Sequence, residues 1–436
     1  MSYKVLSFLL AWLFPKASDR REFRKFCKGI DERKDRKIIY KNQERVVNIL
    51  KNEIKKRKLK VVFLNTENAK WQYQSLYKRF AENPKFDVQV LVSVLRKFKG
   101  KNFTDECREN LIQNYNFFKN RGMNVDFLFD IESKKFKDLR NFSPDIVFYE
   151  QPWGLPDKYS LLKTSKYSLG FYCSYGSCTS NGENEYISSM YRDIFTYFVD
   201  NEYTKNFLIR KGYCKTHLAV AGQIKNDAYF LPIREDNIIW KTNKKRIIYA
   251  PHHSFDKNST LSFGTFNLNY KFFYEYAKAH QEYEFIFKPH PKLKSEIVRT
   301  SLMTKDEADR YFQAWEELEN AQVCDRGDYF DMFRTSDLMI TDSNSFLYEY
   351  LPSKKPLIQL VSLFSVGLNP FGQQIVSGYY KAENNEETEK LIYQLLEKNN
   401  DYKKDIRIDL MTKKFPFIGQ NVSEKIVNYI QSILED

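Results

Sequence analysis

A serine-rich turn in the second half of the chain is the first candidate for chemistry. An apolar run that begins at Leu338 predicts a buried strand, and Thr341, Asp342, Ser343 and Ser345 follow it where a helix is expected to begin. A helix N-terminus carries a positive partial charge and free N–H donors, so it binds phosphate well. Asp342 is expected to cap this helix. The turn therefore predicts a cradle for a diphosphate, although its serines could serve only as helix caps.

Histidines follow two other predicted strands of the same half. Lys288 and His290 lie in the segment Lys-Pro-His-Pro, and His252 and His253 lie in Ala-Pro-His-His. Prolines on both sides of His290 restrict its backbone. A histidine at a strand end can donate to a phosphate oxygen or stabilise a leaving group, or it can cap the strand structurally. We expect His290 and one of the His252/His253 pair to bind the ligand, with Lys288 paired to phosphate.

Three further residues are candidates for contacts with the ligand or the second substrate. Glu349 lies one helical turn past Ser345, where it could accept hydrogen bonds from a ribose or glycerol hydroxyl, or only face solvent. In the first half, Tyr175 precedes Gly176 in a polar loop, and the glycine permits close approach of a ligand. Tyr175 could donate to a substrate oxygen. Lys225 lies just before a polar linker and could touch the ligand or only fix the turn between domains.

The elements that would position these residues alternate along the chain. Short apolar runs separated by helix-like stretches predict parallel sheets with covering helices. We expect an α/β fold of two doubly wound, Rossmann-like domains that face a cleft. Ligands of such sheets bind outside the carboxyl ends of the strands. The predicted division is a basic helical arm over residues 1–59, an acceptor domain over 60–232 and a nucleotide-donor domain over 233–436, with a linker at 232–245.

The charge of the chain is concentrated at its start. The net charge is +14, and residues 1–60 hold 19 Lys and Arg against 7 Asp and Glu, so the rest is nearly neutral. Residues 5–14 are apolar but too few to span a bilayer. They predict an interfacial membrane foot, or a helix packed on the protein body. A basic helix is expected to start near residue 20 and another to cover 33–56. The Lys- and Arg-rich face of the second helix could rest on an anionic membrane surface or only be solvated.

The sequence contains no nucleic-acid-binding motif, so no nucleic-acid partner is expected. Six cysteines show neither paired spacing nor a zinc pattern, which favours a reduced chain without a metal cofactor.

Three segments together resemble the CDP-glycerol glycerophosphotransferase family, the teichoic-acid primases and polymerases. They are Gly-Gln-Ile-Lys-Asn-Asp at 222–227, Lys-Pro-His-Pro at 288–291 and Ile-Thr-Asp-Ser-Asn-Ser at 340–345. The resemblance covers roughly residues 140–400 and implies a metal-independent GT-B enzyme at the inner membrane face. It also implies that His290 and the turn at Ser343 and Ser345 hold the donor diphosphate.

One motif departs from the family. Its teichoic-acid members carry Trp-His-Gly in the first domain, whose histidine is the proposed general base, and the matching segment here is Ser174-Tyr175-Gly176. A tyrosine with a reference pKa near 10 is a poor base at neutral pH. The base is therefore unassigned, and Glu150 or Glu183 is possible. The chain also resembles, more distantly, bacterial polysialyltransferases that use CMP-sugars and, less well, UDP-sugar 2-epimerases.

These observations predict a transferase at the cytoplasmic face of the membrane. It would move a glycerol-phosphate-like or sugar unit from a CDP- or CMP-activated donor to a surface polysaccharide or lipid-linked acceptor, with His290 and Tyr175 as catalytic residues. The alternatives are a GT-B glycosyltransferase that uses another nucleotide sugar, and an inactive protein that binds an anionic glycan.

Overall fold

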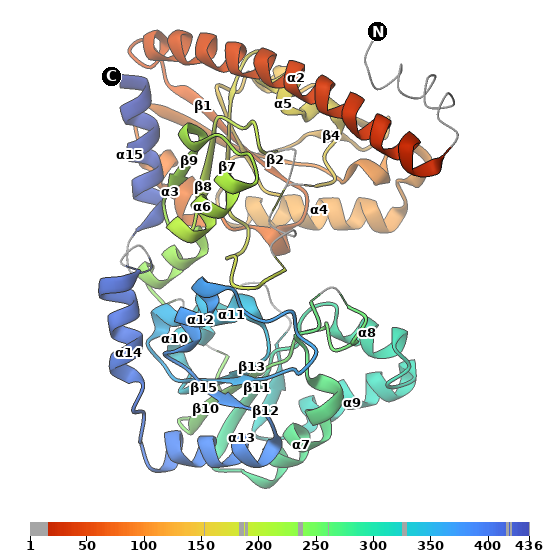
Figure 1. The fold of residues 1–436 in the computed structure, drawn as a ribbon, viewed down its shortest axis with the longest axis vertical. Helices are drawn as coiled ribbons and strands as arrows, with labels where there is room; N and C mark the ends of the chain where they lie inside the picture. The colour runs from red at the N-terminus through yellow and green to blue at the C-terminus, as the bar shows by residue number, and fades with distance from the viewer. Residues whose placement is uncertain are drawn as a thin grey trace.

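Two α/β domains lie one above the other in the computed structural model of the chain (Figure 1). The structure describes residues 16–435, apart from residue 152, residues 183–186, 188–190 and 234–238, residue 260, and residues 325–328, 416–417 and 419–420. The predicted foot at residues 5–14 and the candidate base Glu183 lie outside the described residues. The expected GT-B architecture is confirmed.

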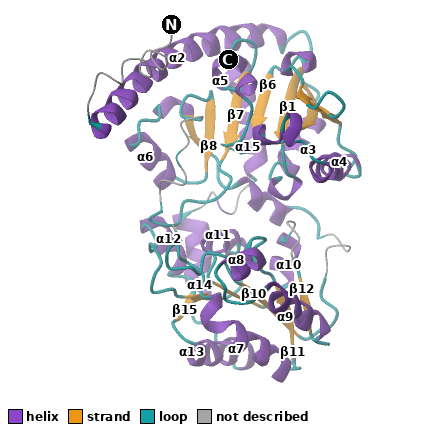
Figure 2. Ribbon diagram, turned by 90° about the vertical axis from the view of Figure 1, so that its right-hand side faces the viewer, coloured by secondary structure: helices purple, strands orange, loops and turns teal. Residues whose placement is uncertain are grey.

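The first domain is built on a seven-stranded parallel sheet of order β3-β2-β1-β6-β7-β8-β9 (Figure 2). Its central strands are largely apolar and buried, as expected of a sheet covered on both faces, whereas the edge strands β3 and β9 are mostly half-buried. Their bounds are β1 Leu59–Asn65, β2 Phe86–Val92, β3 Val125–Phe127, β6 Ile146–Tyr149, β7 Leu169–Cys173, β8 Thr196–Val199 and β9 Leu218–Val220. A small antiparallel pair, β4 Phe129–Asp130 and β5 Lys135–Phe136, lies between β3 and β6 in the chain. The covering helices are α3 Gln74–Glu82, α4 Asp105–Lys119, α5 Leu161–Thr164 and α6 Glu202–Arg210.

The second domain repeats this plan with six parallel strands in the order β12-β11-β10-β13-β14-β15. The strands are β10 Lys245–Ala250, β11 Tyr283–Phe287, β12 Ala321–Val323, β13 Leu338–Thr341, β14 Leu357–Leu360 and β15 Tyr380–Ala382. Its helices are α7 Phe266–Ala279, α8 Leu293–Arg299, α9 Lys305–Glu317, α10 Phe330–Thr335, α11 Asn344–Glu349, α12 Pro370–Val376, α13 Asn385–Ile392 and α14 Lys404–Asp409.

The strand order reverses direction once in each sheet, and each reversal places a crevice at the carboxyl ends of two strands. In the second domain the crevice lies between β10 and β13, where Ala250 pairs with Thr341. His252 follows β10 and Asp342 follows β13 at this point. In the first domain the crevice lies between β1 and β6, and Glu150 directly follows β6. The predicted donor residues therefore lie at the position where doubly wound sheets bind ligands.

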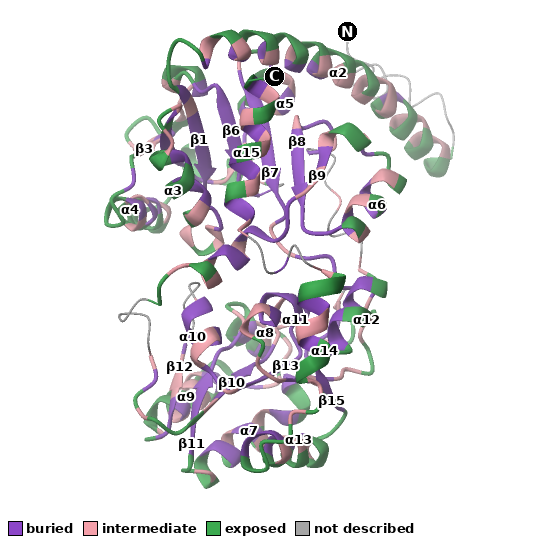
Figure 3. Cartoon of the chain, turned by 90° about the vertical axis from the view of Figure 1, so that its left-hand side faces the viewer, coloured by how far each residue is buried: buried purple, intermediate pink, exposed green. Residues whose placement is uncertain are grey.

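The basic arm is one long helix, α2 Ala17–Glu53, rather than two helices (Figures 1 and 3). Its second half does not form a separate unit, which corrects the predicted arm over residues 1–59. The reason is the apolar stripe of Ile39, Val46, Leu50 and Ile54, which is buried in the core of the first domain. The outer face stays exposed, and the ribbon of α2 is largely green in Figure 3.

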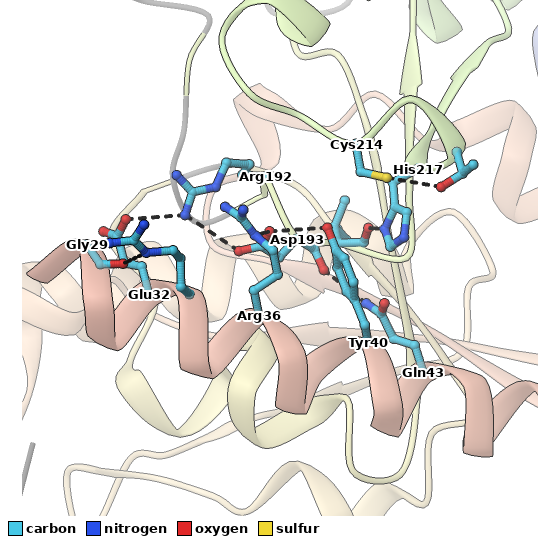
Figure 4. Close-up of polar contacts among 12 residues, drawn as sticks. Gly29, Glu32, Arg36, Tyr40, Gln43, Arg192, Asp193, Cys214 and His217 are labelled. Atoms are coloured by element: carbon cyan, nitrogen blue, oxygen red, sulfur yellow. Dashed lines mark hydrogen bonds and ion pairs between the residues drawn. The ribbon is translucent and has the colours of Figure 1, made fainter.

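Polar contacts fix α2 to the first domain (Figure 4). Arg36 Nε lies 2.6 Å from a carboxylate oxygen of Asp193, and the Gln43 side-chain amide donates to the Asp193 backbone carbonyl at 3.0 Å. Arg192 reaches Glu32 on α2 at 3.2 Å. Asp193 therefore binds the helix through both its side chain and its main chain.

The last helix also departs from the predicted division. α15 Val422–Glu435 packs on α2 and α3 of the first domain, so the second domain does not extend to residue 436 (Figure 1). Val422, Ile426, Ile430 and Leu434 complete the first-domain core, because they form one apolar face of this amphipathic helix. Asp227 holds its start by accepting the backbone N–H groups of residues 422 and 423 at 2.6 and 2.7 Å.

Candidate functional site

Three imidazoles gather at the ends of β10 and β11. The ring centroids of His253 and His290 are 4.1 Å apart, and the His252 ring lies 4.3 Å from His253 and 5.0 Å from His290. Burial lowers the pKa of all three rings, that of His290 to about 3. Neighbouring imidazoles lower it further at His252 and His290, and Lys292 lowers it at all three. The three rings are therefore neutral in the ligand-free protein. An anion between them would favour the protonated form, so the site is arranged for negative charge.

The backbone decides which nitrogen of the His290 ring carries the proton. The Lys292 N–H donates to His290 Nδ1 at 3.1 Å. A backbone N–H can only donate, so Nδ1 accepts and the proton of the neutral ring lies on Nε2. His252 Nδ1 lies 2.7 Å from the Ser254 hydroxyl, which can donate or accept, and 3.3 Å from the Ser254 backbone nitrogen. The contacts of His252 therefore allow either tautomer, whereas His290 presents an Nε2–H donor. This chemistry suits a phosphate oxygen.

The three imidazoles also have the spacing of metal ligands. The candidate ligand atoms of His252, His253 and His290 lie within 4.8 Å of one another, a spacing that a transition metal could use. A neutral histidine that ligates through Nε2 must carry its proton on Nδ1. At His290 the Lys292 N–H occupies Nδ1, so ligation through Nε2 there would require this contact to break. The expectation that the protein works without a metal cofactor stays a prediction.

Asp342 has a different role from the predicted helix cap. Its buried carboxylate accepts the His252 N–H at 2.5 Å, the Thr265 N–H at 2.6 Å and the Thr265 hydroxyl at 2.9 Å. Burial raises its pKa to about 6 in spite of these bonds. Asp342 therefore fixes the imidazole loop across the crevice instead of the helix. Ser343 occupies the cap position of α11, without a side-chain capping bond.

The predicted serine turn is formed as a compact unit next to Asp342. The Thr341 hydroxyl donates to the Ala250 carbonyl at 2.6 Å and accepts the Ser343 N–H at 3.0 Å. The hydroxyls of Ser343 and Ser345 lie 3.2 Å apart. The Thr341 hydroxyl is already hydrogen-bonded within the protein both as donor and as acceptor. We therefore expect Thr341 to support donor binding by shaping the turn. Contact of Ser343 and Ser345 with a ligand stays a prediction.

The remaining candidates form a chain of contacts that crosses between the domains. Lys225 of the first domain lies 3.2 Å from a carboxylate oxygen of Glu349, and its ammonium lies 4.6 Å from the centre of the Tyr175 ring. Glu349 also accepts the Tyr329 hydroxyl. The Lys288 ammonium lies 4.8 Å from the centre of the Tyr329 ring.

This arrangement means that Glu349 is neither solvated nor free for a ribose. Burial opposes the charge of Lys225, but Glu349 outweighs it and the pKa of Lys225 is raised. A hydroxyl of a bound ligand would have to share the Glu349 carboxylate with Lys225, or take the place of Lys225 there. The contacts of Tyr175, Lys225, Lys288 and Glu349 with a ligand stay predictions.

Glu150, a possible base, is buried at the first-domain crevice. One of its oxygens accepts the Asn65 side-chain amide and the other accepts the Thr66 N–H at 3.0 Å. Burial raises its pKa to about 8. Both oxygens therefore serve to connect the ends of β1 and β6, which leaves Glu150 poorly placed to receive a proton from a substrate.

Two residues at the site carry no signal in the sequence. Thr265 and Tyr329 lie 77 and 20 residues from the partners that they contact, Asp342 and Glu349. Neither belongs to a short motif. A contact of this kind becomes visible only when the loops that follow different strands are brought together by the sheet.

The sequence comparison identifies the family. The profile of the CDP-glycerol:poly(glycerophosphate) glycerophosphotransferases matches residues 176–432. The chain belongs to this family. The matched region contains the imidazole loops, the serine turn and Lys225. It begins at Gly176, directly after Tyr175, the residue that differs from the family motif. The family predicted from three short segments is therefore confirmed.

A curated relative is the teichoic acid ribitol-phosphate polymerase TarK of Staphylococcus aureus (strain NCTC 8325 / PS 47). It is 23% identical over 334 residues, which are 67% of this chain and 61% of TarK. The chain thus spans less than two thirds of that relative.

Solved structures of two epimerases share the two-domain fold. A putative UDP-N-acetylglucosamine 2-epimerase from Listeria monocytogenes has a TM-score of 0.57 at 16% identity, covering 87% of this chain and 97% of its own. The UDP-GlcNAc 2-epimerase from Neisseria meningitidis, bound to UDP-GlcNAc, has a TM-score of 0.55 at 16% identity, covering 86% and 100%. At these identities the likeness concerns the fold.

Proposed function

We propose that the protein transfers a glycerol-phosphate-like unit from a cytidine-diphosphate donor to a hydroxyl of a cell-surface polymer or lipid-linked acceptor. The family membership supports the reaction class, and the donor groups at the β10–β13 crevice support the position of the diphosphate. The single observation that carries the proposal is the tautomer of His290, whose Nδ1 accepts the Lys292 N–H. A neutral imidazole that presents an Nε2–H group, together with the serine turn and Lys288, suits a diphosphate.

In the proposed reaction the acceptor oxygen attacks the phosphorus that bears the glycerol unit. The new bond joins this oxygen to phosphorus, and the bond from phosphorus to the bridging oxygen breaks. The leaving CMP keeps the bridging oxygen and its negative charge. His290 Nε2–H and the ammonium of Lys288 stabilise that charge, and the hydroxyls of Ser343 and Ser345 orient the phosphates. The acceptor enters from the first domain, on the side of Tyr175.

The exposed face of α2 supports the further proposal that the enzyme works on an anionic membrane surface, at the cytoplasmic face. Basic residues on this face include Lys25, Lys37, Lys41 and Arg45, and Phe26 is 61% exposed among them. Cationic side chains with interspersed apolar ones suit the headgroup region of a bilayer. No described helix combines the length and apolar character needed to cross a membrane.

The proposed function is tested with a panel of donors. The protein is incubated with CDP-glycerol, a CMP-sugar and a UDP-sugar, together with a membrane extract as acceptor source, and products are detected by mass spectrometry. We expect release of CMP from CDP-glycerol and growth of the acceptor by glycerol phosphate. His290→Ala should reduce this turnover by orders of magnitude while the protein still folds, with a modestly lower thermal unfolding midpoint because the Lys292 N–H loses its acceptor. Transfer from the UDP-sugar alone would overturn the proposal and favour a conventional glycosyltransferase.

A further inference from the structure

Buried polar side chains without partners gather where the two domains meet. They come from the loops after β7, β8 and β9 in the first domain and from α11 in the second. Among the described residues, none of their side-chain polar atoms named here makes a hydrogen bond of normal geometry, and each residue is more than nine-tenths buried. Tyr197 lies close to Ser174, and the Gln223 backbone lies close to Tyr348. The set consists of Ser174 Oγ, Ser177 Oγ, both carboxylate oxygens of Asp200, both amide atoms of Gln223, Asn344 Nδ2 and Tyr348 Oη. Buried polar groups are normally paired, so such a concentration indicates a place that receives a polar ligand.

Asp200 differs from every other buried carboxylate of the described first domain. Asp145 is paired with Arg57, and Asp193 with Arg36. Glu150 accepts from the loop after β1, and Asp227 accepts from the start of α15. Each of these four has a structural partner for its charge. Asp200, at the carboxyl end of β8, is completely buried and has no ion pair among the described residues. The side chains of Ser177, Thr204 and Asn201 lie near its carboxylate, but none makes a hydrogen bond of normal geometry with it.

The position of Asp200 connects it to the donor turn. Tyr348 lies beside Asp200, close enough for the two groups to influence each other's ionisation, and beside the backbone of Gln223. Asn344 and Tyr348 are four residues apart, so they share the face of α11 that is turned to the first domain. The Thr179 hydroxyl donates to the Asn344 carbonyl across the same seam at 3.3 Å. Asn344 directly follows Ser343. Asp200 therefore faces, across the seam, the helix that carries the predicted diphosphate cradle.

We propose that Asp200 is the general base that accepts the proton of the acceptor hydroxyl, a role that rests on the proposed function. As the acceptor oxygen bonds to the donor phosphorus, its O–H bond breaks and the proton passes to a carboxylate oxygen of Asp200. The P–O bond to CMP breaks in the same step, and CMP leaves with that electron pair. Asp200 thus supplies the function for which the family motif uses a histidine at the position of Tyr175.

The electrostatics agree with this role. Burial raises the pKa of Asp200 to about 6, although Thr204, Ser177 and Asn201 lie close enough to lower it. A base with a pKa slightly below neutral is ionised at pH 7 and still accepts a proton during the reaction. The titratable groups that face it are Tyr348 and Tyr197, whose pKa values are well above the ordinary range because of burial. Neither tyrosine titrates near pH 6.

Access to Asp200 requires the domains to separate at this seam, because groups of both domains cover it. Asn369 of the second domain donates to the Cys178 carbonyl at 2.8 Å and to the Ser180 carbonyl at 3.3 Å. Together with the Lys225–Glu349 pair, these contacts close the seam in the ligand-free protein. An acceptor hydroxyl that enters the seam would replace some of these contacts between the domains.

The test compares Asp200→Asn with a matched control, Asp227→Asn, in the full-length protein with CDP-glycerol and the membrane acceptor. Asparagine has the shape of aspartate but cannot accept the proton. We expect Asp200→Asn to lower kcat about 100-fold or more, the usual range for a general base, while the Kd for CDP stays within about threefold of the wild type. Asp227→Asn, which weakens only the attachment of α15, should lower the unfolding midpoint and keep kcat near that of the wild type.

Two further measurements make the result decisive. If Asp200→Asn does not fold, Asp200→Ser is used, because serine is small and polar enough for the seam. In the wild type, kcat should fall as the pH drops below about 6, and this acid limb should be absent from the residual activity of the variants. Turnover within about threefold of the wild type in a folded variant would overturn the role of Asp200 alone. A wild type that releases no CMP from any cytidine donor would overturn the proposed function, and with it this inference.

Discussion

The tautomer of His290 gives the sharpest prediction about donor binding. Two substitutions separate the two nitrogens of the ring. Asparagine can place an oxygen near the position of Nδ1, where it accepts the Lys292 N–H, but it offers nothing at the position of Nε2. Glutamine can place an N–H near Nε2 but does not reproduce the acceptor at Nδ1. His290→Asn should therefore keep the loop and lose the ligand contact, and His290→Gln should do the reverse.

The expected magnitude follows from the number of bonds that each variant loses. A hydrogen bond to a charged group contributes about 1.5 to 3 kcal/mol, so loss of the Nε2 donor should weaken CDP binding about 10- to 150-fold. His290→Gln should bind CDP more tightly than His290→Asn but unfold at a lower temperature, because the Lys292 N–H loses its acceptor.

Isothermal titration with CDP and thermal unfolding of the three proteins measure both effects. The ligand for the titration is CDP alone, so the result does not depend on finding the natural acceptor. Wild-type affinity in His290→Asn would refute the idea that the Nε2–H group holds the diphosphate. An affinity of His290→Gln no better than that of His290→Asn would show that the loop, and not the donor atom, is what matters.

Three other perturbations have definite expected outcomes. Asp342→Ala leaves the N–H groups of His252 and Thr265 without an acceptor. The free energy of unfolding in urea should therefore fall by about 2 to 5 kcal/mol, and CDP binding should weaken. Unchanged stability would contradict the role assigned to this carboxylate. The raised pKa of Glu150, about 8, means that its protonated form stabilises the fold at low pH and that this stability is lost as the pH rises through 8. The stability of the wild type relative to Glu150→Gln should therefore fall by about 3 kcal/mol between pH 5 and 7, and a flat difference would place the pKa elsewhere. Charge reversal at Lys37 and Lys41 on α2 should reduce sedimentation with vesicles containing anionic lipid at least tenfold, whereas reversal at Lys271 and Lys278 on the distant α7 should not; equal losses would argue against a membrane-facing α2.

Much of the fold could be predicted from the sequence because its signals are local. The buried strands of both sheets are continuous apolar runs. The apolar run Val61–Leu64 lies within the observed β1, and the run Leu338–Thr341 coincides with β13. Short edge strands such as β9 and β15 were not predicted, because three residues are too few to establish a period. The placement of α15 was also wrong, since an amphipathic helix specifies an apolar face but not which domain covers it.

In the candidate site, too, features with a local sequence signal could be predicted and features that depend on the fold could not. Motif residues such as His290 and Ser343 could be found because a strand end, a proline or a serine pair marks them. The function of Asp342 could not, because its partner Thr265 belongs to a different loop and the bond depends on how two strands are ordered in the sheet. Asp200 gave no signal either. A carboxylate followed by Asn201 at the start of α6 looks like an ordinary helix cap, and Asn201 does cap that helix through the Thr204 N–H.

The return of the chain to the first domain has a practical consequence for dissecting this enzyme. A fragment that stops before α15 would expose the apolar groove that Val422, Ile426 and Ile430 fill, so the amino-terminal half should not be obtainable as a well-behaved piece by itself. The segment from β10 to α14, by contrast, has its own sheet and its own core. It is the natural minimal unit for measuring nucleotide affinity without the first domain.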